Sequence, residues 1–337
     1  MGIFNEVMLE LQLTEDQLKD NQIYNFALQY SRRKNIGDWI QYKNGNAIIE
    51  INKNDGTSIR TILSDEEYQP EFPESIDMNI SNRCENNCSF CHQKCTKNGK
   101  EANIVKYLTL KDSFLWTLQP GTELALNGNE PLHKDLIHLL RFCKTRNILA
   151  NLTVNEITLL KHKRKIEKYL KDGYIHGIGI SPMSFSDEMI QFCTKHNTAV
   201  IHTIAGITTM DQYQKLMDKN LKILILGYKD FGRGIDYASK HNDRIEKLIV
   251  QLSNEIKNFP KHFDVVSFDN LAIQQLDPKS FLTEKQWEMF YRGDDGKHTL
   301  FVDLVNETFA KNSIQCKENH RPLLSDIRDM LKVIRES

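Results

Sequence analysis

The chain has 337 residues, 40% of them hydrophobic, which is enough for one large core with an appendage. Its 44 Lys and Arg residues balance 45 Asp and Glu residues, so the overall charge does not favour a polyanionic partner such as nucleic acid. The sequence has no membrane-length apolar run and no signal-peptide pattern, and four of its seven cysteines are clustered, so we expect a cytoplasmic protein with a metal site and no membrane partner.

Residues 1–73 are predicted to form a small α+β appendage. Apolar residues at helical spacing predict helix within residues 1–35. Three β-rich runs between residues 38 and 62 follow, separated by Asn44-Gly45 and by Asp55-Gly56, which are hairpin signals. We interpret this meander as a packing or lid module.

Residues 74–235 alternate β-rich runs with amphipathic runs, which is typical of a parallel α/β core. The predicted strands lie at residues 75–81, 123–127, 149–154, 175–180, 198–204 and 222–227. The predicted helices lie at residues 109–118, 132–146, 156–171, 186–196 and 209–219. In such a fold, functional side chains gather at the carboxyl ends of the strands.

Three cysteines follow the first of these strands with the spacing C-x3-C-x2-C: Cys84, Cys88 and Cys91. Three thiols on one tight loop favour a single metal centre. A structural zinc site is one alternative, but zinc takes four protein ligands and no second Cys/His pair of the required spacing follows. A cubane iron–sulfur cluster held by three cysteines instead leaves one iron without a protein ligand, and clusters accept such irregular spacings.

A fourth cysteine, Cys95, extends the run to C-x3-C-x2-C-x3-C, which is close to the ferredoxin run C-x2-C-x2-C-x3-C-P. The first spacer is one residue longer, Thr96 stands in place of proline, and the sequence has no second cluster motif. We therefore interpret Cys95 as a nearby free thiol. The alternative is a non-enzymatic iron–sulfur electron-transfer protein with Cys95 as the fourth ligand.

The cysteine loop, with Phe90 just before its last cysteine, resembles the cluster loop of the radical S-adenosylmethionine superfamily. After the next predicted strand comes N-G-N-E-P at residues 127–131, which is similar to the Gly-Gly-Glu-Pro motif of that superfamily. In that superfamily the motif binds the amino group of S-adenosylmethionine. An ammonium group needs hydrogen-bond acceptors, and a carboxylate accepts a charge-assisted hydrogen bond. The residues that match the motif are Gly128, Glu130 and Pro131, whereas Asn127 and Asn129 depart from it.

The resemblance implies a partial (β/α)6 TIM-like barrel at residues 74–235, closed by a C-terminal extension at 236–337. It implies that the three cysteines hold a [4Fe–4S] cluster whose open iron binds S-adenosylmethionine. Phe90 would then pack near the adenine, and Gly128, Asn129, Glu130 and Pro131 would bind the amino group. An electron from the cluster would cleave the cofactor to methionine and a 5′-deoxyadenosyl radical, which abstracts hydrogen from the substrate.

The partners implied are an external one-electron reductant similar to flavodoxin or ferredoxin, and a substrate that the sequence does not identify. A small molecule or nucleoside, a peptide and a glycyl-radical protein all fit the resemblance. The basic run between Lys161 and Lys171 is interleaved with acidic residues and has few aromatics, so we interpret it as a solvated helix face rather than a nucleic-acid site.

Other candidates lie at the ends of later strands. Asn155 and Ser181 end two of them, and the resemblance implies that Ser181 contacts the ribose or carboxylate of the cofactor, while a simple turn residue before proline is the alternative. His202 lies within the fifth strand, where a core histidine is favoured over a proton donor. Lys229 and Arg233 lie in a glycine-rich loop and are candidate donors to a carboxylate or phosphate of substrate or cofactor.

Residues 236–337 are predicted to begin with a long helix from Tyr237 to Lys257 and to include strands at 264–269 and 298–303 and a last helix from Pro322. Cys316 in this part is a weak candidate for a hydrogen-atom donor, and a buried structural thiol is the favoured interpretation. The remaining cysteines are scattered, so we expect a single cluster.

Overall fold

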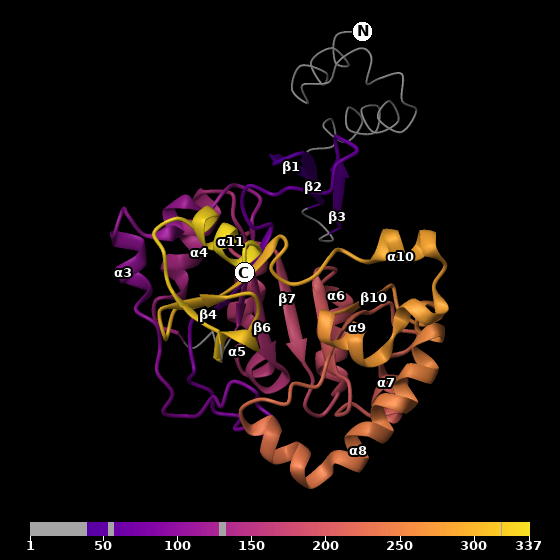
Figure 1. The fold of residues 1–337 in the computed structure, drawn as a ribbon. Helices are drawn as coiled ribbons and strands as arrows, with labels where there is room; N and C mark the ends of the chain where they lie inside the picture. The colour runs from indigo at the N-terminus through magenta and orange to yellow at the C-terminus, as the bar shows by residue number, and fades with distance from the viewer. Residues whose placement is uncertain (1–38, 53–56, 128–132, 318) are drawn as a thin grey trace. The chain divides into compact units, whose positions relative to one another are not determined.

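The computed structural model describes residues 39–52, 57–127, 133–317 and 319–337, and the chain divides into two compact units, Met1–Phe72 and Pro73–Ser337 (Figure 1). The helix predicted within residues 1–35 and the Asp55-Gly56 turn lie outside the described residues. Among the described helices, none combines the length and the apolar character that crossing a membrane requires.

The first unit contains the predicted meander, an antiparallel sheet of β1 (Trp39–Asn44), β2 (Ala47–Asn52) and β3 (Ser58–Ile62) in that spatial order. Gly45 in the first turn has a φ of 58°, which glycine adopts without strain. The fully buried Asn44 beside it donates to the carbonyl of Phe72 (2.8 Å) and accepts from the backbone N–H of Glu71 (2.8 Å). These bonds tie the end of the unit to its first hairpin.

The second unit is built on a ten-stranded sheet in the order β10-β9-β8-β7-β6-β5-β4-β11-β12-β13. The strands from β10 to β11 in this order are parallel, and β12 and β13 pair antiparallel at the end. Their bounds are β4 (Ser75–Asn79), β5 (Glu123–Asn127), β6 (Leu149–Asn155), β7 (Gly177–Ser181), β8 (Ala199–Ile204), β9 (Lys222–Leu226), β10 (Val265–Phe268), β11 (Thr299–Asp303), β12 (Thr308–Ala310) and β13 (Arg321–Pro322).

Helices connect the parallel strands, as the alternating sequence pattern predicts (Figure 1). The α-helices are α3 (Ile104–Thr109), α4 (Leu136–Thr145), α5 (Glu156–Lys171), α6 (Asp187–Lys195), α7 (Met210–Leu216), α8 (Arg233–Glu255), α9 (Asn270–Leu276), α10 (Glu284–Phe290) and α11 (Ile327–Arg335). Short 3-10 helices are η2 (Phe114–Thr117), η4 (Ile256–Lys261), η5 (Pro278–Phe281) and η6 (Gln315–Lys317).

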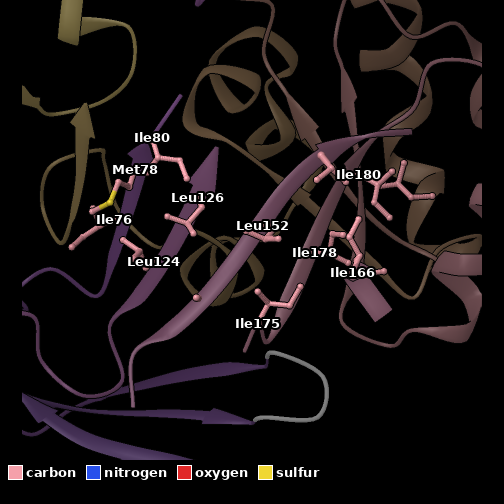
Figure 2. Close-up of a cluster of buried hydrophobic side chains, with 14 of the residues drawn as sticks. Ile76, Met78, Ile80, Leu124, Leu126, Leu152, Ile166, Ile175, Ile178 and Ile180 are labelled. Atoms are coloured by element: carbon pink, nitrogen blue, oxygen red, sulfur yellow. The ribbon is translucent and has the colours of Figure 1, made fainter. Parts of the chain in front are cut away.

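The two faces of the parallel sheet differ in chemistry because successive side chains of a strand point to opposite faces. One face packs against the helices in a single apolar core, to which Ile76, Met78, Leu124, Leu126 and Leu152 belong (Figure 2). Many of the alternate positions carry polar side chains that keep some exposure: Asp77, Asn151, Thr153, Asn155, Ser181 and His202. The second face therefore holds most of the candidate site residues on the strands.

The helix predicted at residues 109–118 is wrong. The chain instead forms α3 before this segment and η2 within it. Asn103 and Ser113 each accept a hydrogen bond from a backbone N–H two or three residues later, and these caps start two separate short helices. Likewise the last helix begins at Ile327 rather than at Pro322, because Asp326 caps it and residues 321–322 form β13.

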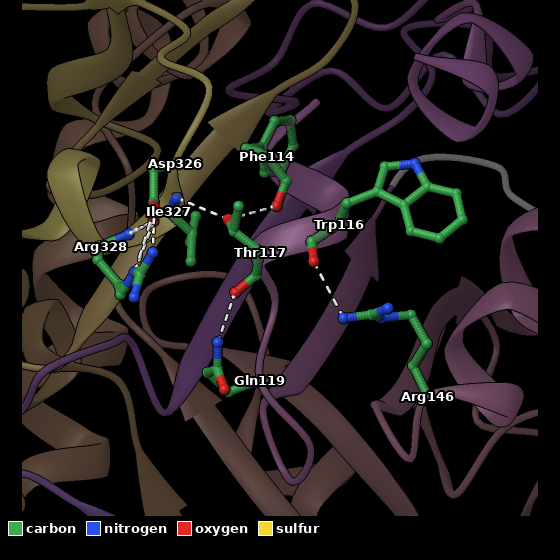
Figure 3. Close-up of polar contacts among 8 residues, drawn as sticks. All are labelled: Phe114, Trp116, Thr117, Gln119, Arg146, Asp326, Ile327 and Arg328. Carbon is green, nitrogen blue, oxygen red and sulfur yellow. Dashed lines mark hydrogen bonds and ion pairs between the residues drawn. The ribbon is translucent and has the colours of Figure 1, made fainter. Parts of the chain in front are cut away.

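The C-terminal residues belong to the same unit as the parallel strands. β11 pairs with β4, so residues 299–322 extend the sheet at that edge. α11 begins against η2, where the backbone N–H of Ile327 donates to Thr117 Oγ1 (2.9 Å), and Arg328 pairs with its capping Asp326 (Figure 3). Nearby, Arg146 Nη2 donates to the carbonyl of Trp116 (3.0 Å). The predicted division into residues 74–235 and 236–337 stays a prediction.

Candidate active site

The predicted cluster loop lies directly after β4, at the carboxyl edge of the parallel sheet. Its two ends are joined by isolated bridges between Ser81 and Glu101 and between Arg83 and Thr96. The backbone N–H of Cys84 donates to the carbonyl of Thr96 (2.8 Å), which closes the loop around the other cysteines. The loop is therefore fixed at its base, and the four cysteines lie between Arg83 and Thr96.

Within the loop the three predicted ligands are free, half-buried thiols. The backbone N–H of Cys91 donates to the carbonyl of Cys88 (3.2 Å), and that of Lys94 donates to the carbonyl of Cys91 (3.2 Å), so two tight turns follow one another. Burial raises the pKa of Cys88, and the negative charges of Cys91 and Cys84 raise it further. The three thiols thus lie close enough to influence one another electrostatically.

Cys95 is buried, with 6% of its surface exposed, and lies beside Cys91. A hydrogen bond from the Cys95 side chain lowers the pKa of Cys91 to about 5. Cys95 Sγ also lies 3.6 Å from Gln93 Oε1. The fourth thiol is therefore a neighbour of one predicted ligand, as a free thiol or a fourth ligand would be.

Thiols are the kind of ligand that an iron–sulfur cluster takes. Among the described residues, no three His, Cys, Asp or Glu side chains converge on a point that would hold one metal ion. A cubane is larger and keeps its thiolate ligands apart on separate irons. Half-exposed thiols on one loop, soft ligands that bind iron–sulfur clusters, fit such a group.

The predicted motif after β5 is only partly described. Gly128, Asn129, Glu130 and Pro131 lie outside the described residues. Asn127, which precedes them, accepts a weak hydrogen bond at Oδ1 from Gln93 Nε2 of the cysteine loop (3.5 Å). Phe90 of that loop meets Tyr237 of α8 edge to face, with ring centroids 5.9 Å apart. The end of β5 and the start of α8 thus both adjoin the loop.

Asn155 and Ser181 lie opposite each other at the carboxyl ends of β6 and β7. Asn155 caps α5, because its Oδ1 accepts the backbone N–H of Thr158 (2.9 Å). Ser181 begins the loop to α6, and that loop is organised by a residue that sequence reasoning missed, Glu156. Only 1% of Glu156 is exposed, and its carboxylate accepts from the backbone N–H groups of Met183, Ser184, Phe185 and Ser186.

His202 lies on the polar face of β8 beside Gly179 of β7. Burial lowers the pKa of His202 to about 4, so the imidazole is neutral at physiological pH. A Cβ at Gly179 would lie 2.2 Å from His202 Cε1 and 2.4 Å from its Nε2. Glycine at this position thus makes room for the ring.

We expect Gly179→Ala to destabilise the protein by about 1–3 kcal/mol, the usual range for forcing extra atoms into a packed site. The imidazole of His202 is the obstacle, so the same substitution in a His202→Ala background is expected to cost much less. Denaturant unfolding of the two single variants and the double variant measures this coupling. Additive effects would show that the ring is not what Gly179 accommodates.

Lys229 and Arg233 occupy different surroundings. Lys229 Nζ donates to Ser313 Oγ (3.2 Å). Arg233, the first residue of α8, instead donates to backbone carbonyls of the cysteine loop: Nε to that of Cys88 (2.8 Å), and Nη1 and Nη2 to that of Cys95 (3.0 and 3.1 Å). The structure therefore brings Arg233 to the predicted metal ligands, and Lys229 to the C-terminal part of the chain.

Asp77 on β4 is a further polar-face residue that the sequence did not mark. Asp77 is exposed on the polar face, but the protein that surrounds it partly desolvates its carboxyl and raises the pKa to about 6; Lys229 opposes this shift, and Asp295 and Asp269 add to it. Asp269 caps α9 and accepts from the backbone N–H of Gly227 (2.8 Å). No single signal in the β4 sequence distinguishes such an acid from any other inward-facing polar residue.

Cys316 lies in the C-terminal part of the chain, and its backbone N–H donates to the carbonyl of Asn312 (3.1 Å). It is buried with Phe301 and Ala310 in a small cluster of its own, and its Sγ lies 3.6 Å from Thr308 Oγ1. Cys316 is thus buried, and its interpretation as a structural thiol stays a prediction.

No family model and no curated protein matches the chain. The fold is similar to that of SuiB from Streptococcus suis, a structure solved with bound S-adenosylmethionine. The match has a TM-score of 0.56 and covers 88% of this chain and 87% of the other, with 12% sequence identity. At this identity the likeness concerns the fold: a mixed α/β chain with a large parallel sheet that is shared with a protein able to bind S-adenosylmethionine.

Proposed function

We propose that this chain is a radical S-adenosylmethionine enzyme in which Cys84, Cys88 and Cys91 hold a [4Fe–4S] cluster. One observation carries the proposal. Three free, half-buried thiols with the spacing C-x3-C-x2-C lie on a loop at the carboxyl edge of a parallel sheet, in a fold similar to one solved with S-adenosylmethionine. When bound, the cluster would supply one electron to S-adenosylmethionine, and the 5′-deoxyadenosyl radical so formed would abstract hydrogen from the substrate.

The protein's own residues would bind and orient the reactants. The acceptors for the cofactor's ammonium would be the carboxylate of Glu130 and the backbone around Gly128, Asn129 and Pro131. Phe90 would pack against the adenine. Asn155 and Ser181, which are neighbours at the carboxyl edge, would contact the ribose or the carboxylate. The neutral imidazole of His202 deeper on the polar face would face the substrate.

The architecture that goes with this function is a partial (β/α)6 barrel formed by β4 to β9 with their helices. The polar face of the sheet would be its interior. The first unit would serve as a lid or packing module. Residues 236–337 extend the sheet at both edges, with β10 beside β9 and β11 beside β4. The partners would be a flavodoxin- or ferredoxin-like reductant and a small molecule, nucleoside or peptide substrate, and the compartment would be the cytoplasm.

Anaerobic reconstitution tests the proposal. The iron-loaded protein is expected to show the absorption and electron paramagnetic resonance spectra of a [4Fe–4S] cluster, and the spectrum of the reduced cluster is expected to change when S-adenosylmethionine is added. With dithionite as the reductant, it is expected to release 5′-deoxyadenosine, which chromatography quantifies. A loaded cluster whose spectrum does not respond to the cofactor would contradict the proposal.

The burial of Cys95 beside Cys91 favours one alternative function, that of an iron–sulfur electron-transfer protein with four cysteine ligands. In that protein the side chain of Cys95 would close the cluster, and S-adenosylmethionine would have no iron to bind. The two functions differ in what Cys95 does, so substitution of this residue separates them.

A further inference from the structure

The start of α8 holds the cysteine loop through its backbone. The backbone N–H of Arg233 donates to the carbonyl of Cys91 (3.1 Å), and its guanidinium donates to the carbonyls of Cys88 and Cys95 at 2.8–3.1 Å. Thus one residue, more than 130 positions away in sequence, contacts the backbone of two predicted ligands and of Cys95.

The shape of a guanidinium makes these contacts specific. Its N–H groups lie in one plane in a fixed fork, so the two carbonyls that they bind are held at a set separation. Nε, Nη1 and Nη2 of Arg233 all donate to the loop. Arg233 is therefore engaged by the backbone of the cysteine loop through all three of its guanidinium nitrogens.

A glycine lets α8 approach the loop this closely. Gly232 has a φ of 60°, and a Cβ at this residue would lie 2.2 Å from the carbonyl oxygen of His92 and 3.0 Å from that of Cys91. A side chain here would have to displace backbone atoms, which is costly. On the next turn of α8, Tyr237 contacts Phe90 edge to face. Backbone, guanidinium and aromatic contacts thus all join the first turns of α8 to one loop.

We propose that Arg233 is a positioning residue that, with Gly232, holds the cysteine loop in the form that receives the cluster, and that its positive charge raises the reduction potential of that cluster. The inference rests on the proposed function, because it concerns the same metal site. Hydrogen bonds and positive charge around a cluster stabilise its reduced, more negative state. The guanidinium supplies the positive charge beside the ligands, where it donates to the backbone carbonyls of Cys88 and Cys95.

Three variants separate the contributions of charge and geometry. Arg233→Gln removes both, Arg233→Lys keeps the charge but loses the planar fork, and Gly232→Ala keeps Arg233 but inserts a Cβ against His92. A matched control is Arg146→Gln, which removes an arginine that also donates to two backbone carbonyls, those of Trp116 and Leu118. Arg146 lies at the end of α4, before β6 begins, and so at the opposite edge of the sheet from the cysteine loop.

The first measurement uses the full chain without iron. Hydrogen–deuterium exchange of the amides between residues 84 and 95 is expected to become at least about tenfold faster in Arg233→Gln, as loss of charge-assisted hydrogen bonds requires. Gly232→Ala and Arg233→Lys are expected to show smaller increases. In the control variant the loop is expected to exchange at the wild-type rate even if the melting temperature falls, which distinguishes positioning from general destabilisation.

The second measurement is made after anaerobic reconstitution. Arg233→Gln is expected to bind less than half of the wild-type iron and sulfide, and its remaining clusters are expected to have a lower midpoint potential. Arg233→Lys is expected to keep a potential close to that of the wild type. Wild-type exchange and cluster content in Arg233→Gln would overturn the proposal. If the wild-type chain binds no cluster, the proposed function fails, and the exchange rates of the iron-free protein still decide whether Arg233 orders the loop.

Discussion

Cys88→Ala is expected to abolish both cluster binding and 5′-deoxyadenosine formation, whereas Cys95→Ala is expected to retain both. Cys88 is the middle thiol of the three, and its removal leaves two ligands for a cluster that needs at least three from this loop. Cys95 is 6% exposed and hydrogen-bonds Cys91, and under the proposed function its removal deletes a neighbour of a ligand rather than a ligand. We expect Cys88→Ala to lose the cluster and the activity completely, and Cys95→Ala to keep nearly all of both.

Iron and sulfide content, the electron paramagnetic resonance spectrum with and without S-adenosylmethionine, and the yield of 5′-deoxyadenosine measure this contrast. Cys143→Ala is the matched control, because Cys143 is a fully buried free thiol in the apolar core of the same unit. If Cys95→Ala loses the cluster as completely as Cys88→Ala does, all four cysteines are ligands and the electron-transfer function is supported instead.

The strands of the parallel core could be predicted because each has a simple pattern. The strands from β4 to β9 all lie within two residues of their predicted starts. Some are continuous apolar runs, such as β9, and in others apolar residues alternate with polar ones, as in Ile76 and Met78 around Asp77. Where residues alternate in this way, the polar ones share one face of the sheet. The sequence therefore indicates a polar face that holds Asn155, Ser181 and His202.

Pairings between distant segments could not be predicted in the same way. The sequence of β11 indicates a strand, but its parallel register with β4 joins residues more than 200 positions apart, and local pattern carries no such information. The prediction of one helix around Phe114 was wrong for a local reason. The apolar residues of this region suit one helix, but the caps at Asn103 and Ser113 divide it into α3 and η2.

In the candidate site, too, local patterns could be predicted from the sequence and contacts between distant segments could not. The metal site on the cysteine loop could be predicted from the spacing of its cysteines, because a metal centre needs several ligands and these lie close together in the sequence. The role of Arg233 does not follow, since the sequence shows a cation in a glycine-rich loop and the structure shows what that cation contacts. Glu156 is a similar case. An acid in the first turn of a helix is common, and only the folded loop at residues 183–186 gives it partners.

Glu156→Gln is expected to destabilise the second unit by about 3 kcal/mol at neutral pH. Burial alone raises the pKa of Glu156, but hydrogen bonds from Ser186, Met183 and Ser184 outweigh it and lower the pKa to about 2, from an ordinary value of 4.5. Each pKa unit corresponds to about 1.4 kcal/mol. Glutamine keeps one acceptor oxygen and places an amide N–H₂ against backbone donors, so the loop after Ser181 loses its anchor.

The pH dependence distinguishes this cause from simple loss of packing. Because the folded-state pKa lies below the unfolded value, the stabilisation is fully present above about pH 5 and is lost as the pH falls towards 2. The difference in unfolding free energy between wild type and Glu156→Gln, measured on the iron-free protein in denaturant, is therefore expected to shrink across that window. Glu167→Gln, on the same helix but in a surface pair with Lys195, is the control and is expected to cost less than about 1 kcal/mol at any pH. A difference for Glu156→Gln that stayed constant from pH 7 to pH 3 would show that shape, rather than the carboxylate charge, holds the loop at the mouth of the site.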